Sequence, residues 1–211
     1  MTLLITEAHL PHTFKARART RRVVYHTTGR NLARLIANKG FTPGTRDFDD
    51  AVIQWYRTSN FAFFGCYLVG TSGACYELAT PRAWTQHAAS LPKDTQKQTP
   101  PQWWLERWPE YRHPTELLDN SRFINATSIG VDLVPMPDAD LPHLHSQATM
   151  EAAAELGRHL AATYGLTLEP RHHLGHEDVD PWRRGKESPW DPGWVRADFM
   201  NLLDPPGKVL G

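Results

Sequence analysis

Hydrophobic residues along the chain follow two periodicities. Short apolar or β-branched runs, which are typical of buried strands, occur at 22–26, 128–133 and 172–174. Apolar residues that recur every three or four positions, which are typical of amphipathic helices, occur at 31–39, 47–59 and 147–164. Ser146 can cap the last of these helices and Gly165 can end it. Strands that alternate with helices predict the α/β fold class.

A hairpin is expected over residues 61–79, turning at Gly70-Thr71 or nearby, for instance in a two-residue turn at these two positions. Because a hairpin contributes antiparallel strands, we predict a mixed central β-sheet flanked by helices. This turn would place Cys66 opposite Cys75 on the neighbouring strand, which is close enough for a disulfide. Two buried thiols are the favoured interpretation for a chain without a signal peptide, and a disulfide is the alternative.

The segment at about 92–122 breaks both periodicities. It is rich in proline and contains Trp103, Trp104 and Trp108, around which one short helix is expected. We therefore predict an N-terminal extension over 1–21 and a single domain over 22–211 that carries this insertion. Large aromatic side chains are usually buried, so the three tryptophans are expected to form the core of a small subdomain. The alternative is that they stack on sugar rings or wall a groove.

Composition and charge exclude several classes of protein. The chain has 211 residues, and its 23 Lys and Arg balance its 23 Asp and Glu, which argues against a dedicated nucleic-acid partner. The two cysteines are too few for a disulfide scaffold or a four-thiolate zinc site. No stretch is apolar for long enough to span a membrane, and the run Leu3-Leu4-Ile5 is too short for a signal peptide. Synthesis in the cytoplasm without a signal peptide is therefore expected.

Three residues form a candidate metal site at the ends of predicted strands. His26 closes the run RVVYH, His176 lies in LGHEDVDP, and Asp191 lies in WDPG. Two imidazoles and one carboxylate leave the fourth tetrahedral position of Zn²⁺ open, which is typical of catalytic zinc sites. By spacing alone this evidence is weak, because a chain with 11 histidines offers other candidates such as His172 and His173.

Five motifs occur in an order that resembles a known family. They are VVYHTTG, CYLVGTSGACYEL, AWTQHAA, NATSIGVDLV and GHEDVDPWRRGKESPWDPG. The chain from about Arg22 to Gly193 resembles the zinc-dependent N-acetylmuramoyl-L-alanine amidases, which include phage lysozyme-type amidases, bacterial recycling amidases and peptidoglycan recognition proteins. The resemblance implies the mixed α/β fold of that family.

The resemblance implies roles for individual residues. His26, His176 and Asp191 fall on the zinc ligands, and Asp132 falls where the family often has a glutamate that acts as general base. Asp132 is one methylene shorter than glutamate, which shortens its reach towards a zinc-bound water. The alternative role for Asp132 is a buried strand carboxylate that is satisfied by hydrogen bonds. Lys186 falls near the lysine that supports the oxyanion.

The position of Lys186 departs from the family pattern, because it precedes Asp191 by five residues whereas the family's lysine usually precedes the aspartate by two. Arg183 or Arg184 is therefore an alternative. Further substrate contacts are implied at positions of the groove or its scaffold, which are Trp84, His87 and Asn125.

The implied activity is hydrolysis of the amide between the lactyl group of N-acetylmuramic acid and L-alanine of the peptidoglycan stem peptide, with Zn²⁺ as cofactor. A monomeric phage-type or secreted antibacterial enzyme is expected, which reaches the cell wall or periplasm after lysis or secretion. An immunity protein or a secretion-system component is a candidate partner. A non-catalytic peptidoglycan-binding module of the same fold is the main alternative, and a zinc hydrolase of another amide is a third.

Overall fold

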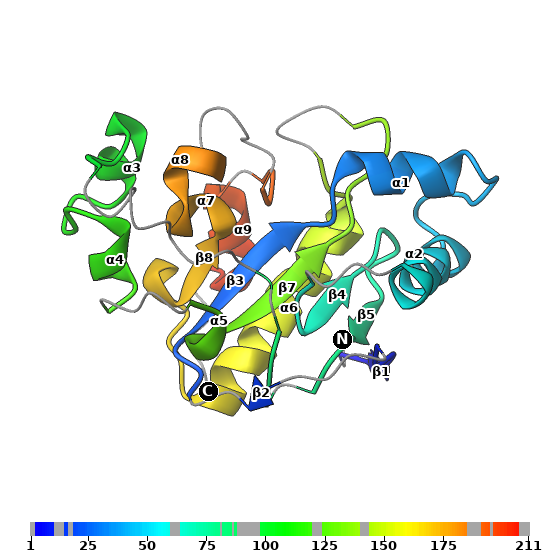
Figure 1. Ribbon diagram of the computed structural model, residues 1–211, viewed down its shortest axis with the longest axis horizontal. Helices are drawn as coiled ribbons and strands as arrows, with labels where there is room; N and C mark the ends of the chain where they lie inside the picture. Colours follow the sequence, from blue (N-terminus) through cyan, green and yellow to red (C-terminus); the bar gives the residue numbers. More distant parts are fainter. Residues whose placement is uncertain are drawn as a thin grey trace.

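The computed structural model describes residues 3–10, 15–16, 19–59, 64–80, 82–85, 87, 98–119, 124–139, 144–184, 191–194 and 196–206. A six-stranded sheet, with strands in the order β1-β5-β4-β7-β3-β8, forms the centre of the described part (Figure 1). Its strands are β1 (Ile5–Glu7), β3 (Arg22–Thr27), β4 (Tyr67–Val69), β5 (Cys75–Glu77), β7 (Ser128–Leu133) and β8 (His173–Gly175). Only β4 and β5 pair antiparallel within it, which confirms the mixed sheet. A second, two-stranded sheet pairs β2 (Lys15–Ala16) with β6 (Ala83–Trp84).

The helices flank the central sheet as the hydrophobic pattern predicts. The longer helices are α1 (Arg30–Ala37), α2 (Arg46–Thr58), α6 (Gln147–Tyr164) and α9 (Arg196–Leu203). The shorter ones are α3 (Gln102–Arg107), α4 (Pro114–Leu117), α5 (Ile124–Thr127), α7 (His176–Val179) and α8 (Pro181–Arg184), with a 3₁₀ turn at Pro170–His172. Ser146 caps α6 by accepting the amide of Thr149 at 3.0 Å, and Gly165 ends it with φ 65°. None of the described helices is long and apolar enough to cross a membrane.

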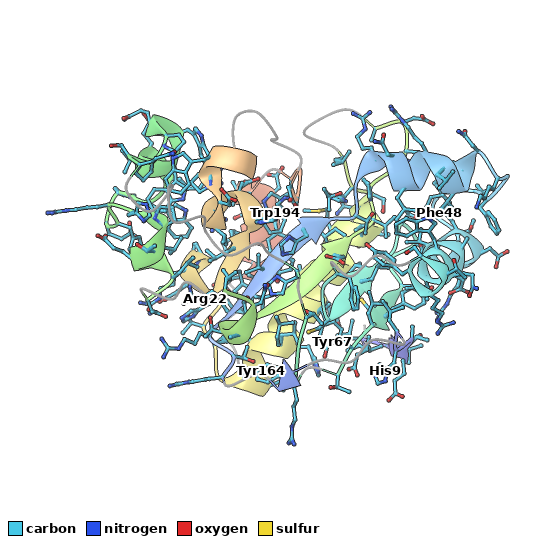
Figure 2. All side chains as sticks on the ribbon, viewed as in Figure 1. His9, Arg22, Phe48, Tyr67, Tyr164 and Trp194 are labelled. Carbon is cyan, nitrogen blue, oxygen red and sulfur yellow. The ribbon has the colours of Figure 1, made fainter. Side chains whose placement is uncertain are left out.

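Three hydrophobic clusters cover the two faces of the sheet. The helices α6 and α9 pack on one face against Tyr67, Val131 and Trp194, which belong to one cluster. On the opposite face, α1 and α2 pack around Phe48 over β4 and β5, whereas the third cluster, around Trp104, covers β3 and β8. Figure 2 labels members of the first two clusters. The middle of this second face, over β3 and β7, lies between the α1–α2 cluster and the Trp104 cluster.

The hairpin is present and turns near Gly70-Thr71, but the register that a two-residue turn there would give is not found. Val69 pairs with Cys75, because the turn spans Gly70 to Ala74 instead of two residues. The carboxylate of Asp49, on α2, holds this longer turn by accepting the backbone amide of Thr71 at 2.7 Å. Gly70 lets the carboxylate approach, since a Cβ there would lie 2.1 Å from Asp49 Cγ.

The longer turn moves the two cysteines out of register. Cys66 and Cys75 are buried thiols rather than partners in a disulfide, as the favoured interpretation had it. Burial raises the pKa of the Cys75 thiol to about 12, so it stays protonated. The predicted thiols are therefore confirmed, although they do not face each other across the hairpin.

Three segments that the sequence left without a detailed prediction contain regular secondary structure. The segment expected as an N-terminal extension supplies β1, which pairs parallel with β5 at the edge of the sheet. The insertion contains α3 and α4, and its Trp104 and Trp108 are buried, as expected. They pack against Val24 of β3 and Leu174 of β8, so they join the core over the central sheet instead of forming the core of a separate subdomain. The loop expected over 175–194 contains α7 and α8 in its described part.

Candidate functional site

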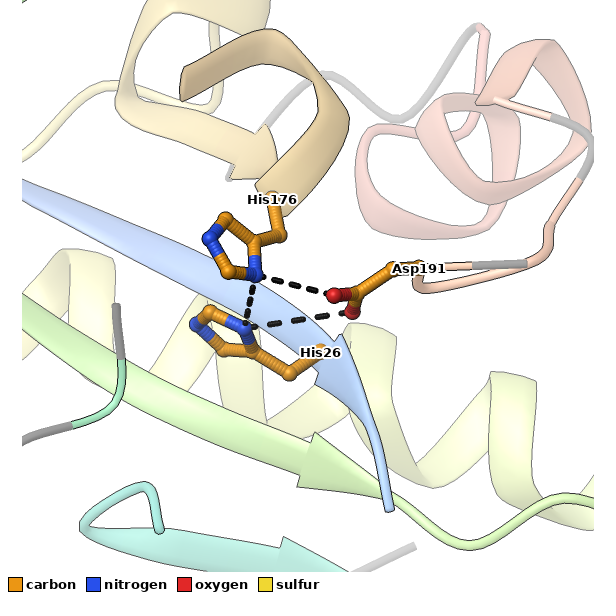
Figure 3. Close-up of side chains that lie close together, drawn as sticks. All are labelled: His26, His176 and Asp191. Atoms are coloured by element: carbon orange, nitrogen blue, oxygen red, sulfur yellow. Dashed lines mark hydrogen bonds and ion pairs between the residues drawn. The ribbon is translucent and has the colours of Figure 1, made fainter. Parts of the chain in front are cut away.

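His26, His176 and Asp191 converge at the carboxyl end of β3 (Figure 3). Nδ1 of His26 lies 3.0 Å from Nδ1 of His176, and this second nitrogen lies 2.9 Å from Oδ2 of Asp191. The other carboxylate oxygen lies 3.9 Å from Nδ1 of His26. All three side chains are buried. The sequence prediction therefore identified residues that the fold brings together from three separate segments.

Strand register and local hydrogen bonds place these side chains. His26 pairs with Asp132 on β7, so both side chains point to the same face of the sheet, between the α1–α2 cluster and the Trp104 cluster. His176 is the first residue of α7, directly after β8. Asp191 is fixed on both sides, because its Oδ1 accepts the amide of Thr27 at 3.1 Å and its carbonyl accepts the amide of Glu177 at 3.2 Å.

The residues present fit a zinc ion. One atom from each of His26, His176 and Asp191 lies within 4.8 Å of the others, which matches a shared coordination centre. Imidazole nitrogen and carboxylate oxygen are ordinary zinc ligands, and three protein ligands leave one position for water or substrate. The buried carboxylate of Asp191 also favours a bound cation. A negative charge that is buried without compensation is costly, and neutral imidazoles do not compensate it.

Asp132 is a buried carboxylate on the same face as His26. Its Oδ2 accepts the amide of Gly65 at 2.9 Å. Burial is the main reason that its pKa is raised to about 7; the negative charge of Asp191 adds to the effect, and the hydrogen bond from Gly65 opposes it. A carboxylate with a pKa near neutrality is suited to accept and return a proton.

His87 lies directly against His26 rather than apart from the metal candidates. Its Nδ1 is 3.0 Å from Nε2 of His26, and its Nε2 is 3.0 Å from Oγ of Ser128. The side chain is buried, which places His87 in the scaffold behind the candidate ligand His26. Ser128 is a residue that the sequence reasoning missed, because a serine at the start of a strand carries no distinctive signal.

Among the other predicted residues whose side chains the structure describes, Asn125 is not part of this cluster. Asn125 is buried on α5, which precedes the amino end of β7, whereas Asp132 lies near the carboxyl end of that strand. Lys186 lies outside the described residues, as do the side chains of Trp84, Arg183 and Arg184. Their predicted roles therefore stay predictions.

A second group that the sequence reasoning missed surrounds α7. Asp178, which is fully buried, accepts hydrogen bonds from Arg107 and Trp108 of the insertion, at 2.9 and 3.0 Å. Its other oxygen accepts the amide of Gly175 at 2.8 Å and pairs with Arg196. Burial alone would raise the pKa of Asp178, but the positive charges of Arg196 and Arg107 outweigh it and lower the pKa. The GHED motif contains Asp178, but nothing in the sequence names its partners.

Solved structures share this fold at low sequence identity. A mutant endolysin from Bacillus subtilis is 14% identical, with a TM-score of 0.57, and the match covers 96% of this chain and 99% of that one. The catalytic domain of XlyA is 12% identical with a TM-score of 0.56 over 95% and 99% of the two chains. A selenomethionine derivative of AmpD is 13% identical with a TM-score of 0.56 over 94% of each.

The sequence itself matches a family model. A comparison with curated proteins finds no match, so the assignment depends on the family model and on the fold. The model described as N-acetylmuramoyl-L-alanine amidase matches residues 16–194, which include His26, Asp132, His176 and Asp191. The chain therefore belongs to the N-acetylmuramoyl-L-alanine amidase family, and it is an amidase of the cell-wall-degrading kind.

Proposed function

We propose that the protein is a zinc-dependent amidase that hydrolyses the bond between the lactyl group of N-acetylmuramic acid and L-alanine of the stem peptide. The observation that carries this proposal is the convergence of His26, His176 and Asp191, with Asp132 opposite His26 on the neighbouring strand. A metal-ligand set with one open position beside a carboxylate of raised pKa is suited to hydrolysis of an amide.

His26, His176 and Asp191 would hold the zinc ion, which when bound polarises the scissile carbonyl and lowers the pKa of the attacking water. Asp132 accepts a proton from that water as the water oxygen attacks the carbonyl carbon. Asp132 then delivers the proton to the nitrogen of L-alanine as the C–N bond breaks. Collapse of the intermediate gives the lactyl carboxylic acid and the free amine of the stem peptide. The acid then loses its proton to that amine or to solvent, so the final products are a carboxylate and a protonated amino terminus, and atoms and charges balance.

A cation should stabilise the oxyanion that forms during the attack. Lys186 is the candidate for this role, and Arg183 or Arg184 is the alternative, because all three belong to the segment between His176 and Asp191. We further propose that the enzyme is a monomer of the phage-type or secreted antibacterial kind, that it reaches the cell wall after lysis or secretion, and that an immunity protein or secretion component is a candidate partner.

A binding module of the same fold is the second candidate function. Its distinguishing feature would be a disrupted ligand set, and here all three ligand positions hold residues that can bind zinc and that lie within reach of one another. The geometry therefore favours an enzyme over a module that only binds peptidoglycan.

The deciding experiment digests purified sacculi and identifies the soluble products by mass spectrometry, with and without a chelator. We expect stem peptides that begin with L-alanine, and no release when metal is removed. His176→Ala should lose both bound zinc and release while it remains folded. Binding to sacculi without chelator-sensitive release would identify a binding module, and cleavage at another bond would overturn the proposed substrate.

A further inference from the structure

Both ring nitrogens of His26 have partners in the structure. Nδ1 faces His176 and Asp191, whereas Nε2 faces away from them and lies 3.0 Å from Nδ1 of His87. The far nitrogen of His87, Nε2, lies 3.0 Å from Oγ of Ser128. This hydroxyl in turn donates a hydrogen bond of 2.6 Å to the carbonyl of Ile124. A continuous, buried chain of hydrogen bonds therefore connects the metal candidates to the backbone of α5.

The hydrogens available to each group determine which atom donates and which accepts in this series of hydrogen bonds. A carbonyl oxygen can only accept, so the single hydroxyl hydrogen of Ser128 points to Ile124, and the serine oxygen accepts the hydrogen on Nε2 of His87. A neutral imidazole with its hydrogen on Nε2 has a bare Nδ1, which can accept from Nε2–H of His26. His26 then presents a bare Nδ1 to His176 and Asp191, which is the form that a metal requires.

Packing holds the ring of His87 in the place that this chain requires. A Cβ at Gly130 of β7 would lie 2.4 Å from Cγ of His87, so the imidazole occupies the space that a side chain would fill. The rings of His26 and His87 meet edge to face, with centroids 5.1 Å apart. Only one of the two histidines of the candidate metal site has such support within the described part of the chain. Nε2 of His26 contacts His87, whereas Nε2 of His176 is buried without a hydrogen-bond partner there.

We propose that His87 is a positioning residue that, together with Ser128, fixes the tautomer and the ring orientation of His26 so that Nδ1 is presented to a divalent metal ion. The proposal depends on the metal site proposed above. Because Nδ1 of His26 is then bare in the metal-free protein, Nδ1 of His176 carries a hydrogen. This nitrogen lies 2.9 Å from Oδ2 of Asp191 and can donate the hydrogen to it.

The first test is the affinity for Zn²⁺, measured by competition with a chelator. His87→Phe keeps a ring but removes the acceptor, and we expect binding weaker by about 10- to 100-fold, which is typical when the partner of a ligand histidine is lost. His87→Asn keeps an acceptor oxygen near the position of Nδ1 and should recover most of the affinity. A matched control is His173→Phe, because that buried histidine contacts Tyr25 instead of the metal candidates. Wild-type affinity in His87→Phe would overturn the proposal.

The second test reads the tautomer directly in the metal-free protein, by long-range ¹H–¹⁵N NMR spectra of histidine-labelled samples. We expect the hydrogen of His26 on Nε2 in the wild type, and a loss of this preference in His87→Phe. If that variant does not fold, Ser128→Ala serves instead, since it removes the acceptor for His87, together with the hydrogen bond to Ile124, and should weaken Zn²⁺ binding several-fold. A His26 hydrogen on Nδ1 in the wild type would refute the inference, whereas a wild type with this tautomer that binds no Zn²⁺ would refute the proposed function alone.

Discussion

Nη1 of Arg107 lies 2.9 Å from Oδ1 of Asp178, although the two residues are 71 positions apart in the sequence. Arg107 belongs to α3 of the tryptophan-rich insertion, and Asp178 belongs to α7, which begins with the metal candidate His176. The same guanidinium nitrogen lies 2.8 Å from Glu177. The insertion therefore supports the helix that carries the candidate ligand His176, in addition to the core role of its tryptophans.

We expect Asp178→Ala to destabilise the protein by about 3–5 kcal/mol, because Arg196 and the indole N–H of Trp108 lose their buried acceptor and Arg107 keeps only Glu177 as a carboxylate partner in the described part of the chain. Urea unfolding followed by circular dichroism measures this loss. The matched control is Arg171→Gln, since Arg171 pairs with Glu169 at the surface and its loss should change stability by less than about 1 kcal/mol. Equal effects in the two variants would show that the buried cluster contributes no more than a surface ion pair.

Asp132→Asn tests the proposed base. The asparagine oxygen can still accept the amide of Gly65, so the fold and the zinc content should be unchanged. The amide cannot accept the proton of the attacking water, so release of stem peptide should fall by about 10²- to 10⁴-fold. Metal analysis and digestion of sacculi are run on the same preparation. Full activity with full zinc content would show that another group moves the proton.

His173 makes the stability depend on pH. Burial lowers its pKa from 6.5 to about 4, and the neighbouring His172 adds to this effect. The unfolded chain therefore takes up a proton near pH 6.5 that the folded protein takes up only near pH 4, so the free energy of unfolding falls as the pH drops through this window. At pH 5 the expected loss from this residue is about 2 kcal/mol.

His173→Asn isolates this contribution, because asparagine can still accept the hydroxyl of Tyr25 but does not titrate. The difference in unfolding free energy between wild type and variant should change by about 2 kcal/mol between pH 7.5 and pH 5 in favour of the variant. A difference that stays constant with pH would show that His173 is protonated in the folded protein, which would contradict its lowered pKa.

The sequence predicted the elements that repeat a local pattern. Strand alternation and helical spacing located β3, β7 and α6, and Ser146 and Gly165 marked the two ends of that helix. The order of short motifs identified His26, His176 and Asp191. His26 closes a strand that the pattern also predicts and His176 follows one, whereas Asp191 was recognised from its motif alone. Contacts between distant segments could not be predicted in this way. The contact between Arg107 and Asp178 crosses from an insertion without periodicity, and the chain from His26 to Ser128 requires the packing of His87 over Gly130.

The hairpin turn illustrates the same limit and provides a last prediction. A two-residue turn was the simplest interpretation of Gly70-Thr71, but Asp49 accepts the backbone amides of Thr71 and Ser72, at 2.7 and 3.1 Å, and both of their hydroxyls. Such a carboxylate, 22 positions away from Thr71, sets the length of the turn. No local pattern around the turn contains that information.

Asp49→Asn should therefore destabilise the protein by about 1–3 kcal/mol, because the amide nitrogen replaces an acceptor and meets donors at a buried position. Amide hydrogen exchange of Thr71 and Ser72 should accelerate more than exchange in the strands β3 and β7, since the substitution acts on the turn first. Asp47→Asn is the matched control, because Asp47 lies exposed in the same helical turn of α2. If the amides of Thr71 and Ser72 exchange at the same rate in both variants, the residues of the turn itself determine its conformation. Asp49 would then not determine the register of β4 and β5.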